Sequence, residues 1–127
     1  LVLGRTAHGE TVRAGRLSDR WRIRRDGRPV YADDFRIEGD VAAAGRGGAT
    51  LASGRATASL ILAAEDAGDR LEAVRGVLGG FDIAAGASSW DGLLAVRAVA
   101  GDAQVLRSAV VAVLNLLAGG VPRVWSL

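Results

Sequence analysis

The stretch WRIRRDGRPVYADDFRIEG, residues 21–39, decides how the first part of the chain folds. Apolar and charged residues alternate on both sides of Asp26-Gly27, and an Asp-Gly pair between two alternating segments is the strongest short-range signal of a β-hairpin. A type I′ turn needs a positive φ at both central residues, which Asp and Gly tolerate well. We therefore expect two antiparallel strands, with Arg25, Asp26 and Gly27 as structural residues of the turn.

A two-residue turn also fixes which residues of the two strands face each other. The expected pairs are Arg25 with Arg28, Ile23 with Val30, Trp21 with Ala32, Arg22 with Tyr31 and Arg20 with Asp33. Continued unbroken, this register would turn Phe35 and Ile37 to the polar side of the hairpin. We therefore expect a β-bulge at Asp33-Asp34, where one extra residue returns both side chains to the core side with Leu17.

The adjacent carboxylates Asp33 and Asp34 have two interpretations. A bulge re-aims side chains and is often found beside functional sites, so the pair is a candidate site. The hairpin also supplies many arginines, and opposite charges on facing strand positions stabilise a sheet. A solvated pair with arginine neighbours is the interpretation that the sequence favours.

The rest of the chain alternates predicted strands with predicted helices. Residues 56–65 are apolar on both faces, as in a buried strand, and a second pair, Asp91-Gly92, predicts a hairpin over 84–101 with Leu94, Val96 and Ala98 on one side. A helix is expected over 69–80, with Leu71, Val74, Val77 and Leu78 on one face and Gly79-Gly80 at its end. Asp102 is expected to cap a last helix whose stripe is Leu106, Val110, Val113 and Leu117, ended by Gly119-Gly120 and Pro122. A closing strand, VPRVWSL at 121–127, is expected to follow.

This order predicts an α+β fold in which strands dominate, with antiparallel hairpins and a layered sheet that carries two helices on one side. We expect one domain over 1–127, made of a charged hairpin region (1–39), a glycine-rich connection without a periodic element (40–56) and a β-α-β-β-α(-β) region (57–127). Arg97 interrupts an otherwise apolar strand. If Arg97 is buried, its guanidinium must find a carboxylate or carbonyl groups, because an unpaired internal guanidinium is very costly, and we expect an ion pair.

Composition limits the functions that this chain can have. It has no cysteine, and its sixteen basic and fourteen acidic residues give a net charge of only +2. The two signs are interleaved, which disfavours nucleic-acid binding. The apolar run 109–121 is shorter than the ~20 residues that a membrane span requires. We expect a cytoplasmic protein with neither nucleic acid nor membrane as partner.

Candidate catalytic and metal-binding residues are few. His8 is the one histidine, no serine lies in a GxSxG context, and the glycine-rich segment lacks the lysine of a phosphate-binding loop. Nickel and zinc prefer imidazole and thiolate ligands, so a tight metal site is disfavoured and only weak coordination by His8 and Glu10 is open. We therefore expect no catalytic residues and no enzyme.

Four segments resemble, in order, the C-terminal half of the urease accessory protein UreD, also called UreH. They are LGRTAHGE (3–10), DRWRIRRDGRPVYADDFRIEGD (19–40), GLLAVRAVAGDA (92–103) and VPRVW (121–125). The most specific parts are the GRTA-x-GE signature and the RxxGR hairpin, and the alanine-rich middle is diffuse. Since the chain lacks an initial methionine and the family's N-terminal half, we expect it to be a piece of a longer protein.

The resemblance implies a non-catalytic scaffold in urease maturation. Such a protein binds the urease apoprotein and recruits UreF, through which the GTPase UreG joins, so that nickel is inserted into the urease active site. No cofactor is then held tightly, and nickel is in transit. The candidates for partner contact or the nickel path are first Arg5, His8 and Glu10, and second Asp33 and Asp34.

Two other functions stay open at this point. A stand-alone small-molecule-binding or enzymatic α+β domain would use the glycine-rich segment 40–56 to line a pocket. RNA binding is disfavoured by the interleaved charge, and a steep salt dependence of RNA retention would favour it again.

Overall fold

The computed structural model describes residues 12–46 and 54–121 and shows an α+β fold rich in antiparallel strands, as the sequence predicts. A two-stranded ribbon comes first, formed by β1 (Gly15–Arg25) and β2 (Arg28–Gly39) and followed by a short helix α1 (Val41–Arg46). A three-stranded sheet follows, formed by β3 (Ala56–Ala63), β4 (Ala84–Trp90) and β5 (Leu93–Ala100). The 3-10 turn η2 (Ala67–Arg70) leads into α2 (Leu71–Leu78), and α3 (Ala103–Ala118) follows β5.

The turn of the ribbon forms where the sequence predicts it. Asp26 and Gly27 have φ values of 49° and 76°, so both central residues are left-handed, and Arg25 pairs with Arg28. The next pairs differ from the prediction, because the register shifts directly after Arg24 and Pro29. The predicted bulge at Asp33-Asp34 is wrong, since the extra residue is Val30. The bulge directly follows Pro29, and proline occurs in strands mainly at edges, at strand ends and at bulges.

The early bulge changes every pair that was expected between the turn and Asp33. The observed pairs are Ile23 with Tyr31, Arg22 with Ala32, Trp21 with Asp33 and Arg20 with Asp34. The predicted partners of these four β1 residues are therefore wrong by one residue. Beyond Asp33-Asp34 the predicted and observed registers coincide, and Leu17 and Phe35 pack against the buried Ile37 as predicted.

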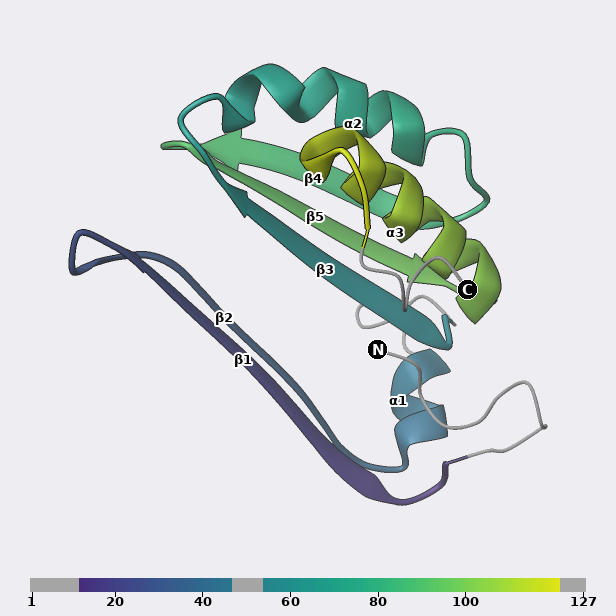
Figure 1. The fold of residues 1–127 in the computed structure, drawn as a ribbon. Helices are drawn as coiled ribbons and strands as arrows, with labels where there is room; N and C mark the ends of the chain where they lie inside the picture. The colour runs from purple at the N-terminus through teal and green to yellow at the C-terminus, as the bar shows by residue number, and fades with distance from the viewer. Residues whose placement is uncertain (1–11, 47–53, 122–127) are drawn as a thin grey trace.

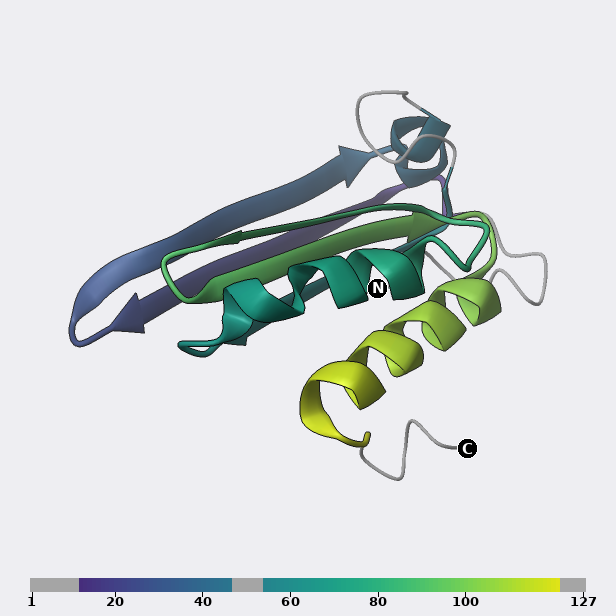
Figure 2. The same cartoon turned by 90° about the horizontal axis from the view of Figure 1, so that it is seen from above.

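The three-stranded sheet has the order β3-β5-β4, and both neighbouring pairs are antiparallel. Asp91 and Gly92, with φ values of 45° and 69°, form the predicted second turn. Strand alternation places Leu94, Val96 and Ala98 on one face, where all three are buried. Helices α2 and α3 cover this face, which forms the main core (Figures 1 and 2).

The two long helices follow their predicted patterns. The predicted helix 69–80 is shorter in the structure, since its first turn is the 3-10 turn η2 and α2 ends at Leu78 before Gly79. Asp102 caps α3 as expected, because its side chain accepts hydrogen bonds from the backbone N–H groups of Gln104 and Val105. Gly119, with φ 69°, ends α3 in the left-handed conformation that glycine favours.

The segment 40–56 contains a regular element that was not predicted. Helix α1 occupies Val41–Arg46, and the Asp40 carboxylate caps it by accepting a 2.9 Å hydrogen bond from the Ala43 N–H. The sequence contains a signal for α1, because an N-cap aspartate precedes a run of helix-forming alanines. Strand β3 ends at Ala63, two residues before the predicted end at 65. The expected closing strand lies outside the described residues, except for Val121.

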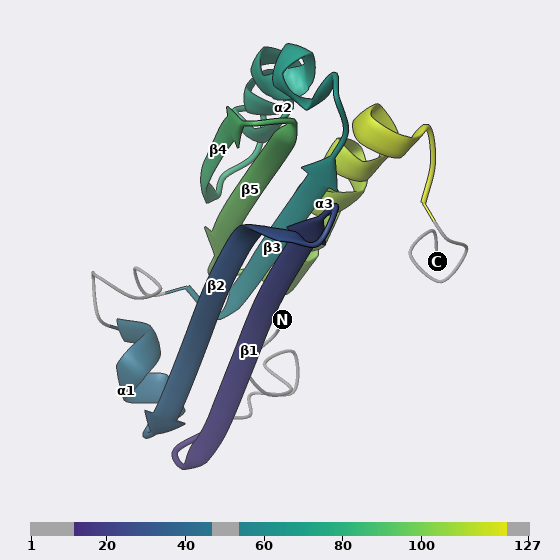
Figure 3. The same ribbon diagram turned by 90° about the vertical axis from the view of Figure 1, so that its left-hand side faces the viewer.

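The ribbon forms a third layer, on the side of the sheet opposite α2 and α3 (Figure 3). Tyr31 of β2 and Trp90 of β4 bring their rings to 6.1 Å between centroids, and Val99 of β5 packs against the cluster around Ile37. The layers are therefore ribbon, sheet and helices. Within residues 12–46 and 54–121, no helix is long and apolar enough to cross a membrane.

Candidate functional site

Alternate residues of the ribbon point away from the sheet and form a charged, exposed surface, which we call the outward face. Its members are Arg16, Ser18, Arg20, Arg22, Ala32, Asp34, Arg36 and Glu38. The alternation follows from strand geometry, since successive side chains point to opposite faces and the facing residues of two paired strands share a side. Four arginines and two carboxylates give the outward face a net charge of +2.

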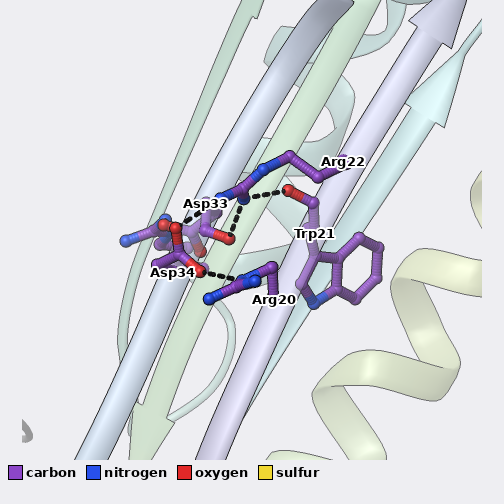
Figure 4. Close-up of polar contacts among 6 residues, drawn as sticks. Arg20, Trp21, Arg22, Asp33 and Asp34 are labelled. Carbon is purple, nitrogen blue, oxygen red and sulfur yellow. Dashed lines mark hydrogen bonds and ion pairs between the residues drawn. The ribbon is translucent and has the colours of Figure 1, made fainter.

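Asp34 lies at the centre of an ion-pair network on this face (Figure 4). Its Oδ1 accepts a 2.8 Å hydrogen bond from Arg20 Nε, and its Oδ2 lies 2.5 Å from Arg22 Nη2. The hydrogen bond from Arg22, followed by that from Arg20, lowers the pKa of Asp34 below its ordinary value of 3.8. Asp34 is therefore a charged and already partnered carboxylate. A second ion pair joins Arg16 and Glu38 further along the same face.

Arg22 ties the two strands together. Besides Asp34, its Nη1 donates hydrogen bonds to two backbone carbonyl oxygens, that of Trp21 at 2.7 Å and that of Asp33 at 2.9 Å (Figure 4). One guanidinium thus bridges β1 and β2 at the level of the two aspartates. A planar, permanently charged side chain with several donors is suited to this bridging position.

The Asp33 side chain lies on the opposite side of the ribbon and faces the three-stranded sheet. Its Oδ1 lies 2.5 Å from Nη2 of Arg97 on β5, and the Asp33 side chain is only 21% exposed. The predicted ion pair of Arg97 is thus confirmed, although the Arg97 side chain is 62% exposed and so is not the internal guanidinium on which the expectation rested. The Tyr31 hydroxyl together with the Asp33 carboxylate raises the pKa of Arg97. Asp33 and Asp34, adjacent in sequence, therefore engage arginines on opposite sides of β2 and do not face each other as a ligand pair.

Arg25 joins the turns of the two hairpins, a contact that the sequence does not reveal. Its Nη1 donates to the carbonyl oxygen of Asp91 at 2.7 Å, and its Nη2 donates to that of Gly92 at 2.9 Å. A Cβ added at Gly92 would lie 3.0 Å from Arg25 Nη1. The close approach of this guanidinium therefore suits a glycine at position 92, while Asp26 and Gly27 keep their expected role in the turn.

The first group of candidates, Arg5, His8 and Glu10, lies outside the described residues, so their place relative to the outward face stays a prediction. In the described part of the chain, no three histidine, cysteine, aspartate or glutamate side chains come together in a way that could hold a metal ion. The chemistry that this surface offers is the pairing of arginine and carboxylate groups with a complementary surface.

A protein-family model described as "UreD urease accessory protein" matches residues 1–126. The chain belongs to the UreD family. Relatives named urease accessory protein UreD include those of Methylobacterium sp. (44% identical over 98% of this chain and 46% of the relative), Xanthobacter autotrophicus (42%, 99% and 44%) and Azorhizobium caulinodans (41%, 100% and 47%). The resemblance inferred from the sequence is thereby confirmed. The chain spans about half the length of these relatives.

Proposed function

We propose that this UreD-family chain is a non-catalytic scaffold in urease maturation. It binds the urease apoprotein and recruits UreF, and through UreF the GTPase UreG, so that nickel is inserted into the urease active site. The observation that carries this proposal is the family match over residues 1–126, together with relatives named as urease accessory proteins.

The outward face is the docking surface that we assign to this scaffold. Its ion pairs are exposed, and such pairs contribute little to folding because water screens them. Arg20, Arg22 and Asp34 can therefore exchange their partners for groups of a second protein without unfolding the ribbon. Arg36 is exposed on this face, and none of the salt bridges between described residues involves it.

Nickel is passed along rather than held in this scheme. Tight nickel sites use imidazole and thiolate ligands, and the chain supplies one histidine and no cysteine. His8 and Glu10 are the weak ligands that we assign to the nickel path, and Arg5 lies in the same signature. An Arg5→Ala or Glu10→Ala change is expected to lower the nickel content of urease in cells, whereas submicromolar nickel binding by this chain alone would contradict transit.

The alternative is a stand-alone small-molecule-binding or enzymatic domain. It places a pocket at the glycine-rich segment 40–56. Residues 47–53 of that segment lie outside the described residues, so this pocket stays a prediction.

Co-purification with urease tests the scaffold. The double change Arg20→Glu and Arg36→Glu reverses the charge of the outward face, while Arg55→Glu reverses an exposed arginine outside the ribbon. We expect the double variant to retain urease subunits about tenfold less well than the unchanged chain, because charge complementarity steers association. Equal retention by both variants would show that the outward face is not the docking surface. If the unchanged chain retained neither urease nor UreF, the proposed scaffold function would be wrong.

A further inference from the structure

Strand β4 lies at the edge of the three-stranded sheet and pairs only with β5 among the described strands. The two-residue turn makes Trp90 and Leu93 a hydrogen-bonded pair, and hydrogen-bonded and open pairs alternate along an antiparallel ladder. Ala85, Ala87 and Ser89 therefore direct their backbone N–H and C=O groups away from β5. The edge of β4 thus presents a row of backbone donors and acceptors.

The side chain of Arg75 already donates hydrogen bonds to one carbonyl of this row. Arg75 of α2 donates from Nη2 to the carbonyl oxygen of Ala87 at 3.0 Å and from Nε at 3.3 Å, which confirms that this carbonyl points outward. The Nη1 of Arg75 pairs with Glu72 at 2.8 Å, and Glu72 is largely exposed. The guanidinium therefore occupies one acceptor of the edge through contacts that water and competing groups can reach.

The sequence of β4 leaves this edge otherwise unprotected. Exposed edge strands usually carry charged residues, proline or a bulge that prevent pairing with another strand. Residues 84–89 read AAGASS and include neither a charged residue nor a proline. The pairing of β4 with β5 is continuous, so β4 has no bulge either. A Cβ built at Gly86 meets no atom within 4 Å, so the strand is also uncrowded at its middle.

A cavity of about 510 Å³ opens beside the same edge, between β4 and the end of α2, which lie side by side in the fold (Figure 1). Its apolar lining includes Leu78, Phe81 and Ile83, and Arg75 is its single charged lining residue. This volume lies within the range of about 300–1,000 Å³ typical of ligand sites. The lining thus combines room for an apolar side chain with a positive charge.

We propose that the groove between α2 and β4 binds an extended segment of a partner protein. The segment adds a strand to β4, places an apolar side chain in the cavity and presents a carboxylate to Arg75. Addition of a strand to a free sheet edge is a recurring mode of peptide recognition, in which backbone hydrogen bonds supply affinity and side-chain pockets supply specificity. This site is separate from the outward face and does not depend on the proposed role in urease maturation.

The charge of the groove selects among the possible occupants. Arg75 is the one charged residue of the lining, and its present partner Glu72 is largely exposed, so a carboxylate of the segment can compete with Glu72 for this guanidinium. The row of backbone groups along β4 favours an extended chain over a small molecule, since a small molecule would leave most of the row unpaired. When the segment binds, its carboxylate replaces Glu72 at Arg75, and its backbone N–H replaces the guanidinium at the Ala87 carbonyl.

A display library of random twelve-residue peptides with free carboxyl termini, selected on the full 127-residue chain, tests the proposal. We expect enriched peptides to combine a carboxylate with β-branched or large apolar residues. Ala87→Pro removes an outward N–H that the new strand needs, and Arg75→Ala removes the cation, so each is expected to weaken binding of the best enriched peptide about tenfold or more. Arg36→Ala, on the opposite side of the molecule's layers, is the control and is expected to leave binding unchanged.

Amide hydrogen exchange supplies a second readout that does not rely on a variant's folding. Binding of the same peptide is expected to slow exchange at Ala85, Ala87 and Ser89, whose N–H groups lie on the outer edge. Failure of the library to yield a peptide, or protection that maps elsewhere, would overturn the proposal. Protection of these amides that rises with protein concentration and needs no peptide would also overturn it, since it would assign the edge to a second copy of the chain.

Discussion

Arg25 and Gly92 are far apart in sequence, yet Arg25 Nη2 donates a 2.9 Å hydrogen bond to the Gly92 carbonyl oxygen. The same guanidinium reaches the Asp91 carbonyl at 2.7 Å. The tip of the ribbon is thus fastened to the turn of the second hairpin. Further along the ribbon, the Asp33 carboxylate and the Tyr31 hydroxyl interact with Arg97 of β5, so polar contacts join the ribbon to the sheet at two places among the described residues.

Removal of the Arg25 guanidinium is expected to destabilise the fold. Arg25→Ala takes away both hydrogen bonds to the second turn, and we expect a loss of about 1 kcal/mol in the free energy of unfolding. Urea denaturation followed by circular dichroism measures it. Arg24→Ala is the matched control, because the hydrogen bond of Arg24 seen among the described residues is a local 3.3 Å contact with the Gly27 carbonyl, and this change is expected to have a smaller effect. Equal effects of the two changes would contradict the fastening role.

The glycines of the two turns are expected to differ in their tolerance of alanine. Gly27 and Gly92 have similar positive φ values of 76° and 69°, so Gly→Ala strains each backbone by about 1 kcal/mol. A Cβ at Gly27 meets open space, whereas one at Gly92 lies 3.2 Å from the Ala64 carbonyl oxygen and 3.0 Å from Arg25 Nη1. Gly92→Ala should therefore lower the thermal midpoint more than Gly27→Ala. Similar midpoints for the two variants would show that Arg25 and the Ala64 carbonyl both give way at no cost.

Acid is expected to weaken the ribbon through Asp34. The folded-state pKa of this carboxyl is lowered by Arg22 and Arg20, so the pair stabilises the fold above the unfolded value near 3.8 and loses that contribution as pH falls further. Asp34→Asn removes the titrating group. Unfolding in urea measured at several values from pH 5 downward should show a shallower loss of stability in this variant. Arg22→Gln removes the main cause of the shift and should change the profile in the same direction. An unchanged profile in Asp34→Asn would mean that the pair does not contribute to folding.

Truncation of a core leucine is expected to be far more costly than truncation of an exposed one. Leu94 is fully buried under α2 and α3, while Leu116 on α3 is 39% exposed. Leu94→Ala is expected to cost about 2–5 kcal/mol because it leaves a cavity, and Leu116→Ala less than about 1 kcal/mol. Chemical denaturation of both variants tests the difference. Comparable losses would place Leu116 in a contact that the described residues do not show.

The sequence predicts the elements with local signals and misses the contacts between distant segments. Both turns can be predicted because Asp and Gly tolerate the positive φ values that such turns require. Helix α3 can be predicted because Asp102 and Gly119 mark its ends. The need for a bulge follows from the alternation, but the alternation does not say where between the turn and Phe35 the extra residue lies. Arg97 is predicted to need an acidic partner, and only the layered packing identifies Asp33.

The candidate site divides in the same way. Asp33 and Asp34 are visible in the sequence as adjacent carboxylates, yet their opposite orientations depend on which residue bulges. The role of Arg25 depends on a turn in another part of the chain, so no local pattern indicates it. Helix α1 was missed because its glycine-rich surroundings outweighed the cap at Asp40.

The bulge at Val30 is the one extra residue that sets the phase of the rest of β2. Deletion of one residue between Val30 and Asp33 can therefore be absorbed by loss of the bulge, which keeps the aspartate that binds Arg97 on the sheet side, whereas insertion of one residue without a second bulge would turn that aspartate toward solvent. We therefore expect natural variants of this segment in the UreD family to accept the loss of one residue more readily than the gain of one.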